Sequence, residues 1–225
     1  MKLTYLSHSA FKLVTDAGIT LLIDPFLTGN PNAPCTADDL QADFIVLTHA
    51  HGDHIGDALD IAKRCKSTII AVNELANYCA KKGCNAHNMH IGGSYKFDFG
   101  RLKFTIAHHG SSTPEGDYAG EPAGVVLSID GKNIYHTGDT GLFLDMQLIG
   151  ELTPLDYMLV PIGDNFTMGI NDAVTAVEFA KPKVAIPMHY NTFPVIAADP
   201  QLFINKLKER GKKGLELAFG EEIEL

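Results

Sequence analysis

The chain has 225 residues, of which 45% are hydrophobic, and its formal net charge at pH 7 is -9. This size and balance suit an ordinary globular core. The acidic charge argues against a broad nucleic-acid surface, because affinity for phosphates depends mainly on clustered Lys and Arg. The opening residues are too polar for a signal peptide, and no apolar run approaches the roughly 20 residues that a membrane span needs. We therefore expect a cytoplasmic protein with a small-molecule substrate and no nucleic-acid or membrane partner.

Short apolar runs in the first part of the chain predict strands, with turn residues between them. These runs lie at residues 3–6, 11–14, 19–23, 44–47 and 68–70. Helical patterns at residues 55–64 and 73–81 bracket the last run. Strands and helices therefore alternate in this part of the chain.

A second series of strand-like runs follows, at residues 102–107, 125–129, 133–136, 157–160 and 184–187. Helical patterns occur near residues 142–152, 172–180 and 200–210, the last with Asp199 as its expected N-cap and Gly211 as its stop. Because this series mirrors the first, we expect an α/β fold of two sheets packed face to face with helices outside. No repeat or linker divides the sequence, which predicts a single domain over residues 1–225.

The segment THAHGDHIGD, residues 48–57, places three histidines and two aspartates directly after the predicted strand 44–47. Residues i and i+2 of an extended segment share a face, so His49 and His51 can bind one ion, while Asp53 and His54 turn toward a neighbouring position. The alternative is a set of surface histidines at a helix start, with Asp53 as a cap. Crowded imidazoles repel one another when protonated and gain no stability, so the spacing predicts metal binding.

This segment resembles the H-x-H-x-D-H signature of the metallo-β-lactamase superfamily. The resemblance extends over nearly the whole chain, through DPFLTGNP upstream, AHHGSS at 107–112, HTGDTGLF at 136–143 and PMHYNTFP at 187–194. Together these segments are similar to the lactonase-like branch, which includes L-ascorbate-6-phosphate lactonases and small metal-dependent hydrolases. The resemblance implies an αββα sandwich of two mixed sheets with outer helices and a two-metal site along the shared edge of the sheets.

The resemblance also implies a ligand set of seven residues. The first site would use His49, His51 and His109, the second would use Asp53, His54 and His189, and Asp139 would bridge them. His108 competes with His109, which aligns with the family pattern, whereas His108 would point to the opposite face of the strand. Imidazole and carboxylate ligands suit several divalent ions, of which we favour zinc or manganese.

Two further residues are expected near these ligands. In this superfamily an aspartate at the position of Asp24 commonly hydrogen-bonds a ligating histidine; the alternative is an exposed turn aspartate before a proline. The lactonase-like branch carries a histidine at the position of His8, facing the cleft, so His8 is a predicted substrate contact. The alternative is an ordinary hydrogen-bonded histidine at a strand end.

Two polar loops follow other predicted strands and are expected to line the cleft. Asn191 and Thr192 lie in one of them, and Asp164 and Asn165 lie in the other. All four are predicted to bind substrate, although the same residue types are common in purely structural turns.

The sequence therefore predicts a metal-dependent hydrolase, in which a hydroxide held between two divalent ions attacks a small ester, lactone or phosphorylated metabolite. Asp53 would orient the hydroxide and carry a proton to the leaving group. A metal-dependent phosphodiesterase or nuclease is the enzymatic alternative. A non-catalytic metal-binding sensor is the alternative from another class, and self-association into a homo-oligomer stays open.

Overall fold

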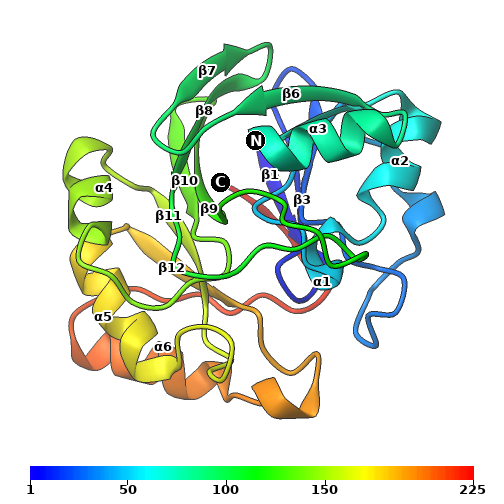
Figure 1. Cartoon of the computed structure of the whole chain (residues 1–225). Helices are drawn as coiled ribbons and strands as arrows, with labels where there is room; N and C mark the ends of the chain where they lie inside the picture. Colours follow the sequence, from blue (N-terminus) through cyan, green and yellow to red (C-terminus); the bar gives the residue numbers. More distant parts are fainter.

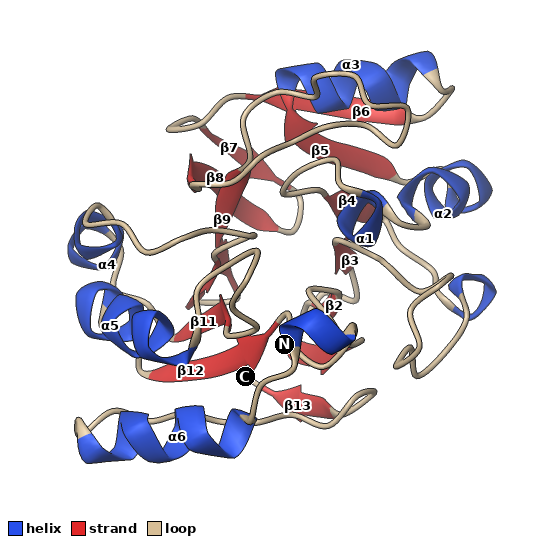
Figure 2. Cartoon of the chain, turned by 60° about the horizontal axis from the view of Figure 1, so that its bottom comes forward, coloured by secondary structure: helices blue, strands red, loops and turns tan.

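Two sheets packed face to face form the centre of the structure, a computed structural model that describes all residues 1–225. Figures 1 and 2 show helices on the outer side of each sheet, which gives four layers. The first sheet and its helices come mainly from the first 90 residues, and the second sheet with its helices comes from the rest. The predicted α/β sandwich is confirmed.

The first sheet has seven strands in the order β13-β1-β2-β3-β4-β5-β6. Strands β13, β1, β2 and β3 pair antiparallel, whereas β3 to β6 pair parallel. Their bounds are β1 (Lys2–Tyr5), β2 (Phe11–Val14), β3 (Thr20–Ile23), β4 (Phe44–Val46), β5 (Thr68–Val72), β6 (Asn85–Met89) and β13 (Glu222–Glu224). The helices of this half are α1 (Gly52–Ile55), α2 (Ala58–Cys65) and α3 (Asn73–Lys81), with a 3₁₀ turn, η1, at Ala37–Asp39.

The second sheet has six strands in the order β12-β11-β10-β9-β8-β7, and β10 to β12 are parallel. Their bounds are β7 (Ser94–Phe97), β8 (Gly100–Ile106), β9 (Ala123–Ile129), β10 (Lys132–His136), β11 (Tyr157–Pro161) and β12 (Val184–Met188). The outer helices are α4 (Met146–Leu152), α5 (Ile170–Ala180) and α6 (Pro200–Glu209), with a 3₁₀ turn, η2, at Pro194–Ile196. Figure 1 shows these three helices grouped along one side of the molecule.

Alternation along the central strands divides the core into two layers. In β9, Val125, Leu127 and Ile129 belong to the large cluster shared by the two sheets, whereas Val126 belongs to the cluster beneath α4 to α6. Successive side chains of a strand point to opposite faces, so one buried strand contributes to both layers. This packing fixes the strand ends, from which the polar residues discussed below project.

Most predicted elements occur near their predicted bounds, and strand 11–14 and helix 73–81 have the predicted limits. The helix predicted at 55–64 is present as α2, but it begins only at Ala58, because a break at Gly56 separates it from the short helix α1. Gly56 has φ +39°, and a Cβ there would lie 2.6 Å from the Cα of Phe26. The chain at Pro25 and Phe26 therefore passes too close for a continuous helix.

The helix predicted at 142–152 begins only at Met146. Asp199 caps α6 as predicted, since its side chain accepts a hydrogen bond from the Gln201 amide. No α-helix of the structure combines the length and the apolar character that crossing a bilayer would require.

A glycine in α4 provides a test of the packing between α4 and α5. A Cβ at Gly150 would collide with the carbonyl oxygen of Ala180. Gly150→Ala should therefore lower the free energy of unfolding by about 1–3 kcal/mol through overpacking, although alanine normally favours a helix over glycine by about 1 kcal/mol. Urea unfolding measures the change. Gly141→Ala, with no atom within 4 Å of the added Cβ, is the control, and an unchanged midpoint for Gly150→Ala would contradict the proposed contact.

Candidate metal centre

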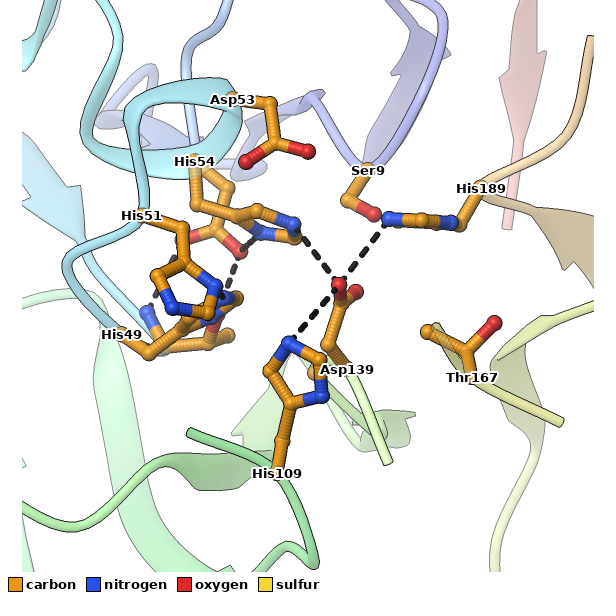
Figure 3. A network of polar contacts seen from close by, with 12 residues as sticks. Ser9, His49, His51, Asp53, His54, His109, Asp139, Thr167 and His189 are labelled. Atoms are coloured by element: carbon orange, nitrogen blue, oxygen red, sulfur yellow. Dashed lines mark hydrogen bonds and ion pairs between the residues drawn. The ribbon is translucent and has the colours of Figure 1, made fainter. Parts of the chain in front are cut away.

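The polar residues of the candidate site follow the carboxyl ends of strands from both sheets. His49, His51, Asp53 and His54 come after β4, and His109, Asp139 and His189 come after β8, β10 and β12. Figure 3 shows their side chains converging on one point from these separate segments. The two sheets therefore share this site at their common edge.

Three imidazoles form the first group of ligand atoms. His49, His51 and His109 each offer a nitrogen, and these atoms lie within 4.8 Å of one another. His49 is fully buried, and its Nε2 lies 3.1 Å from Nδ1 of His51. His108 is exposed instead, with its ring centre 5.1 Å from that of Phe143. The structure thus places His109, not its neighbour, beside the other two histidines.

The second group contains Asp53, His54 and His189 together with His8, again with ligand atoms within 4.8 Å of one another. Asp139 lies between the two groups. Its Oδ2 is 3.2 Å from Nε2 of His54 and 2.9 Å from Nε2 of His189. The same oxygen is 3.7 Å from Nε2 of His109, which belongs to the first group.

Asp24 is fully buried and contacts Nδ1 of His54, on the side of the ring opposite to Asp139. Its Oδ2 accepts hydrogen bonds from Nδ1 of His54 at 2.7 Å and from the Thr48 hydroxyl at 2.6 Å. Its Oδ1 accepts a third hydrogen bond from the Thr48 amide at 2.9 Å. Such a carboxylate fixes the imidazole tautomer, so Nε2 of His54 is directed toward Asp139. This geometry excludes the alternative of an exposed turn aspartate.

Burial and neighbouring charges set the protonation of the site. Burial lowers the pKa values of His49, His51 and His109, which favours the neutral rings that bind metal. Burial also acts to lower the pKa of His54, but the carboxylates of Asp139 and Asp24 outweigh it and raise that pKa well above its usual value. In the metal-free protein, His54 therefore carries a proton near pH 7.

Several buried polar atoms of the site make no hydrogen bond of good geometry, although two of them, Nε2 of His54 and Nε2 of His189, lie within ion-pair distance of Asp139. They are Nε2 of His54, Oδ1 of Asp139, and both ring nitrogens of His189. Buried polar atoms are almost always paired, since leaving them unpaired costs free energy. A divalent cation would engage the lone pairs of such nitrogens and carboxylate oxygens. The residues present therefore fit a metal centre.

Backbone strain is concentrated around the same site. Ten residues other than glycine have positive φ, and seven of them lie in segments that carry site residues: Ser7, His8, Asp24, Asp164, Asn165, His189 and Asn191. Such conformations cost of order 1–3 kcal/mol each and persist where the surrounding structure enforces them. Four of these side chains, those of Ser7, His8, Asp24 and His189, are buried at the ends of strands, whereas Asp164, Asn165 and Asn191 are exposed.

The four residues predicted to bind substrate have different surroundings. Thr192 is buried, and its hydroxyl lies 2.8 Å from Nδ1 of His8. The side chain of Asn191 accepts a hydrogen bond from the Ala198 amide at 2.9 Å and so stabilises its own loop. Asp164 and Asn165 are exposed and remain candidates for substrate contact. His8 is fully buried with both ring nitrogens engaged, which does not favour the predicted substrate contact.

One residue that the sequence analysis did not single out, Ser9, also lies at the site. Figure 3 shows Thr167, from the same predicted polar loop as Asp164 and Asn165, on one side of Asp139 and the Ser9 side chain beside His189. Ser9 is fully buried and its hydroxyl has no hydrogen-bond partner. Its position next to His8 was the only signal in the sequence.

The sequence is similar to known proteins over nearly its whole length. Residues 13–190 match the model of a β-lactamase superfamily domain. The chain belongs to that superfamily. It is 53% identical to a UPF0173 metal-dependent hydrolase of Carboxydothermus hydrogenoformans over 94% of both chains, and 50% identical to one of Anoxybacillus flavithermus over the full length of both. This identity and coverage place it in the UPF0173 family of metal-dependent hydrolases.

A solved structure supports the assignment of this chain to the metal-dependent hydrolases. Igni18, described as a novel metallo hydrolase from Ignicoccus hospitalis, superposes with a TM-score of 0.91 at 40% sequence identity. The alignment covers 100% of this chain and 98% of Igni18. The superfamily resemblance predicted from the motifs is confirmed.

The raised pKa of His54 predicts proton release on metal binding. A cation at Nε2 of His54 should displace its proton near pH 7, and this release should decline as pH rises through the raised pKa, because the ring is then already neutral. Zinc titration in weakly buffered solution with a pH indicator measures the release. Asp24→Asn removes one of the two carboxylates that hold this proton and should reduce the release.

The control for this titration is Asp43→Asn, at the other end of β4. Its proton release on zinc binding should equal that of the wild type. Equal proton release by Asp24→Asn and the wild type would contradict the protonated state assigned to His54.

Proposed function

We propose that this UPF0173 protein hydrolyses a small, uncharged ester or lactone with the help of two divalent cations, zinc or manganese. One observation carries the proposal: a single buried oxygen of Asp139 lies 2.9–3.7 Å from imidazoles of both ligand groups. A carboxylate in that position fits a ligand shared by two ions better than a ligand of a single ion. The seven predicted ligands would hold the pair, three on each side and Asp139 between.

Bound cations would supply a water of lowered pKa and polarise the substrate carbonyl. Asp53 is the carboxylate placed to handle protons, since its side chain is 30% exposed whereas those of Asp139 and Asp24 are at most 3% exposed. Burial acts to raise the pKa of Asp53, but the hydrogen bond from His8 and the nearby His54 keep it below its usual value. Asp53 is therefore ionised near neutral pH and can accept a proton and deliver it to the leaving group.

The segments around the site contain no lysine or arginine. This holds for residues 7–9, 24–34, 48–57, 107–122, 137–145, 161–170 and 188–199. A phosphate remote from the reacting bond is usually held by such cationic side chains. Their absence favours an uncharged substrate over a phosphorylated metabolite.

Aromatic side chains in the same segments support this choice. The rings of Phe26 and Phe193 lie 6.3 Å apart, and each lies 5.7 Å from the ring of His8. Phe166, in the loop after β11, is 54% exposed. Phe166 and the half-buried Phe193 offer apolar surface to the acyl or alcohol part of a substrate, whereas Phe26 is buried and packs behind them.

The two alternatives predicted from the sequence are less well supported. A nuclease would need basic side chains to bind phosphates, and the site segments have none. A structural or sensing centre is usually saturated by protein ligands. The partial exposure of Asp53 and His109, at 30% and 15%, leaves the centre open on one side.

The number of ions provides the first test. Wild-type protein purified without chelator and reconstituted with zinc should contain two ions per chain, and Asp139→Asn should contain one or none, because the bridge is weakened. Plasma mass spectrometry measures the stoichiometry. The exposed Asp145→Asn serves as a matched control and should keep both ions. One ion in the wild type, unaffected by Asp139→Asn, would contradict the bridged centre.

Substrate charge provides a second test. The zinc-loaded enzyme should hydrolyse a neutral lactone or aryl ester with a kcat/KM at least about tenfold above that for the phosphorylated analogue, a difference of about 1.4 kcal/mol. Asp53→Ala should show no turnover with either compound and serves as the blank. A preference for the phosphorylated analogue would contradict the proposed substrate class.

A further inference from the structure

His8 lies immediately after β1, with its side chain fully buried beside the second ligand group. Its ring centre is 4.1 Å from that of His189. The backbone at Ser7 and His8 has φ values of +79° and +56°, which are unfavourable for these residues. The His8 carbonyl accepts hydrogen bonds from the Tyr5 hydroxyl at 2.9 Å and the His189 amide at 2.8 Å. The strained conformation is therefore held from two sides.

The two ring nitrogens of His8 contact different partners. Nε2 lies 3.1 Å from Oδ2 of Asp53, and Nδ1 lies 2.8 Å from the hydroxyl of Thr192. An ionised carboxylate only accepts hydrogen bonds, so the proton belongs on Nε2. Nδ1 then accepts a hydrogen bond from the Thr192 hydroxyl.

His8 is the only hydrogen-bond partner of the Asp53 carboxylate in the structure. By contrast, the carboxylate of Asp24 accepts three hydrogen bonds. Asp53 is also the most exposed of the three carboxylates at the site, so without His8 its side chain would be free to rotate. Phe26 and Phe193 pack edge to face against the His8 ring and so restrict its orientation.

We propose that His8 is a positioning residue that holds one oxygen of Asp53 through an Nε2–H donor, with its tautomer fixed by Thr192. The second Asp53 oxygen is thereby left to face the metal centre. This inference rests on the proposed metal centre and adds a function for two residues outside its seven ligands. Carboxylates that bind metals are themselves hydrogen-bonded, and loss of the partner typically weakens metal affinity 10- to 100-fold.

The competing role for His8 is direct ligation of the second ion. In that case Nε2 would carry a lone pair toward the metal and Nδ1–H would donate to Thr192. The 3.1 Å contact with the Asp53 carboxylate would then be a distance between two ligands of one ion. The second ion already has four ligands in the proposed centre without His8, namely Asp53, His54, His189 and the shared Asp139, which favours the donor role. The test below separates the two roles.

The test compares His8→Gln with His8→Leu. The glutamine amide can place an N–H near the position of Nε2, whereas leucine has a similar volume and no donor, and both incur the same cost of positive φ. Cobalt(II) titration of each metal-free variant should show that His8→Leu weakens binding of the second ion about 10- to 100-fold. His8→Gln should bind within about threefold of the wild type and keep the cobalt absorption spectrum unchanged.

A second pair of variants keeps the inference testable if His8→Leu does not fold. Thr192→Val removes the hydroxyl that fixes the tautomer, and Thr192→Ser retains it. Thr192→Val should weaken binding of the second ion severalfold, and Thr192→Ser should leave that affinity unchanged. Thermal unfolding of the metal-free variants shows whether each has folded.

Three results would overturn the role proposed for His8. They are wild-type affinity in both His8→Leu and Thr192→Val, failure of His8→Gln to restore affinity, and a changed coordination spectrum in His8→Gln, which would indicate direct ligation. A wild-type protein that never binds a second ion contradicts the proposed two-metal centre instead, so the two failures are distinguishable.

Discussion

The buried carboxylate of Asp139 imposes the main constraint on this structure. Its side chain is 3% exposed, and no lysine or arginine occurs in the segments around it. Burying a charge is costly unless it is paired. Its partners within ion-pair distance are imidazoles, His54 from the first half of the sandwich and His109 and His189 from the second. The two sheets must therefore meet at the edge where these residues project, and the packed core between them holds that edge in place.

Residues at this same edge lower the stability of the metal-free fold. Strained backbone at His8, Asp24 and His189 and unpaired polar atoms on His54 and Asp139 all reduce the stability of the metal-free fold. The hydrophobic layers on both faces of strands such as β9 offset this cost. A cation that engages the unpaired atoms would recover part of it, so metal binding and folding are coupled in this protein.

The sequence predicted the elements whose pattern is set by burial. Strand 11–14 and helix 73–81 have clear apolar periods and were found at their predicted bounds. Strand β6, with the sequence NAHNM, was missed because it has a polar face at the edge of the sheet and no apolar run. The break at Gly56 was missed because it arises from contact with Pro25 and Phe26, which lie some thirty positions away in the chain.

The residues of the candidate site also divide into those that the sequence predicted and those that it did not. The crowding of His49, His51, Asp53 and His54 is visible in one short segment, and the resemblance supplied the distant members, which the structure brings together. The family pattern favoured His109 over His108, and the structure has that arrangement. The hydrogen bond between His8 and Thr192 joins residues 184 positions apart. No local pattern encodes such a pair, because it depends on how β1 and the loop after β12 meet in space.

Strand β13 has a consequence for how the protein forms during synthesis. It pairs with β1 and covers what would otherwise be the open edge of the first sheet, beside the strand that leads into His8. An uncovered edge strand is a template for pairing with other chains. Residues 222–224 are made about two hundred positions after β1, so β1 emerges from the ribosome long before its partner strand. The backbone groups along this edge of β1 therefore stay unpaired during synthesis, until β13 has been made and can pair with them.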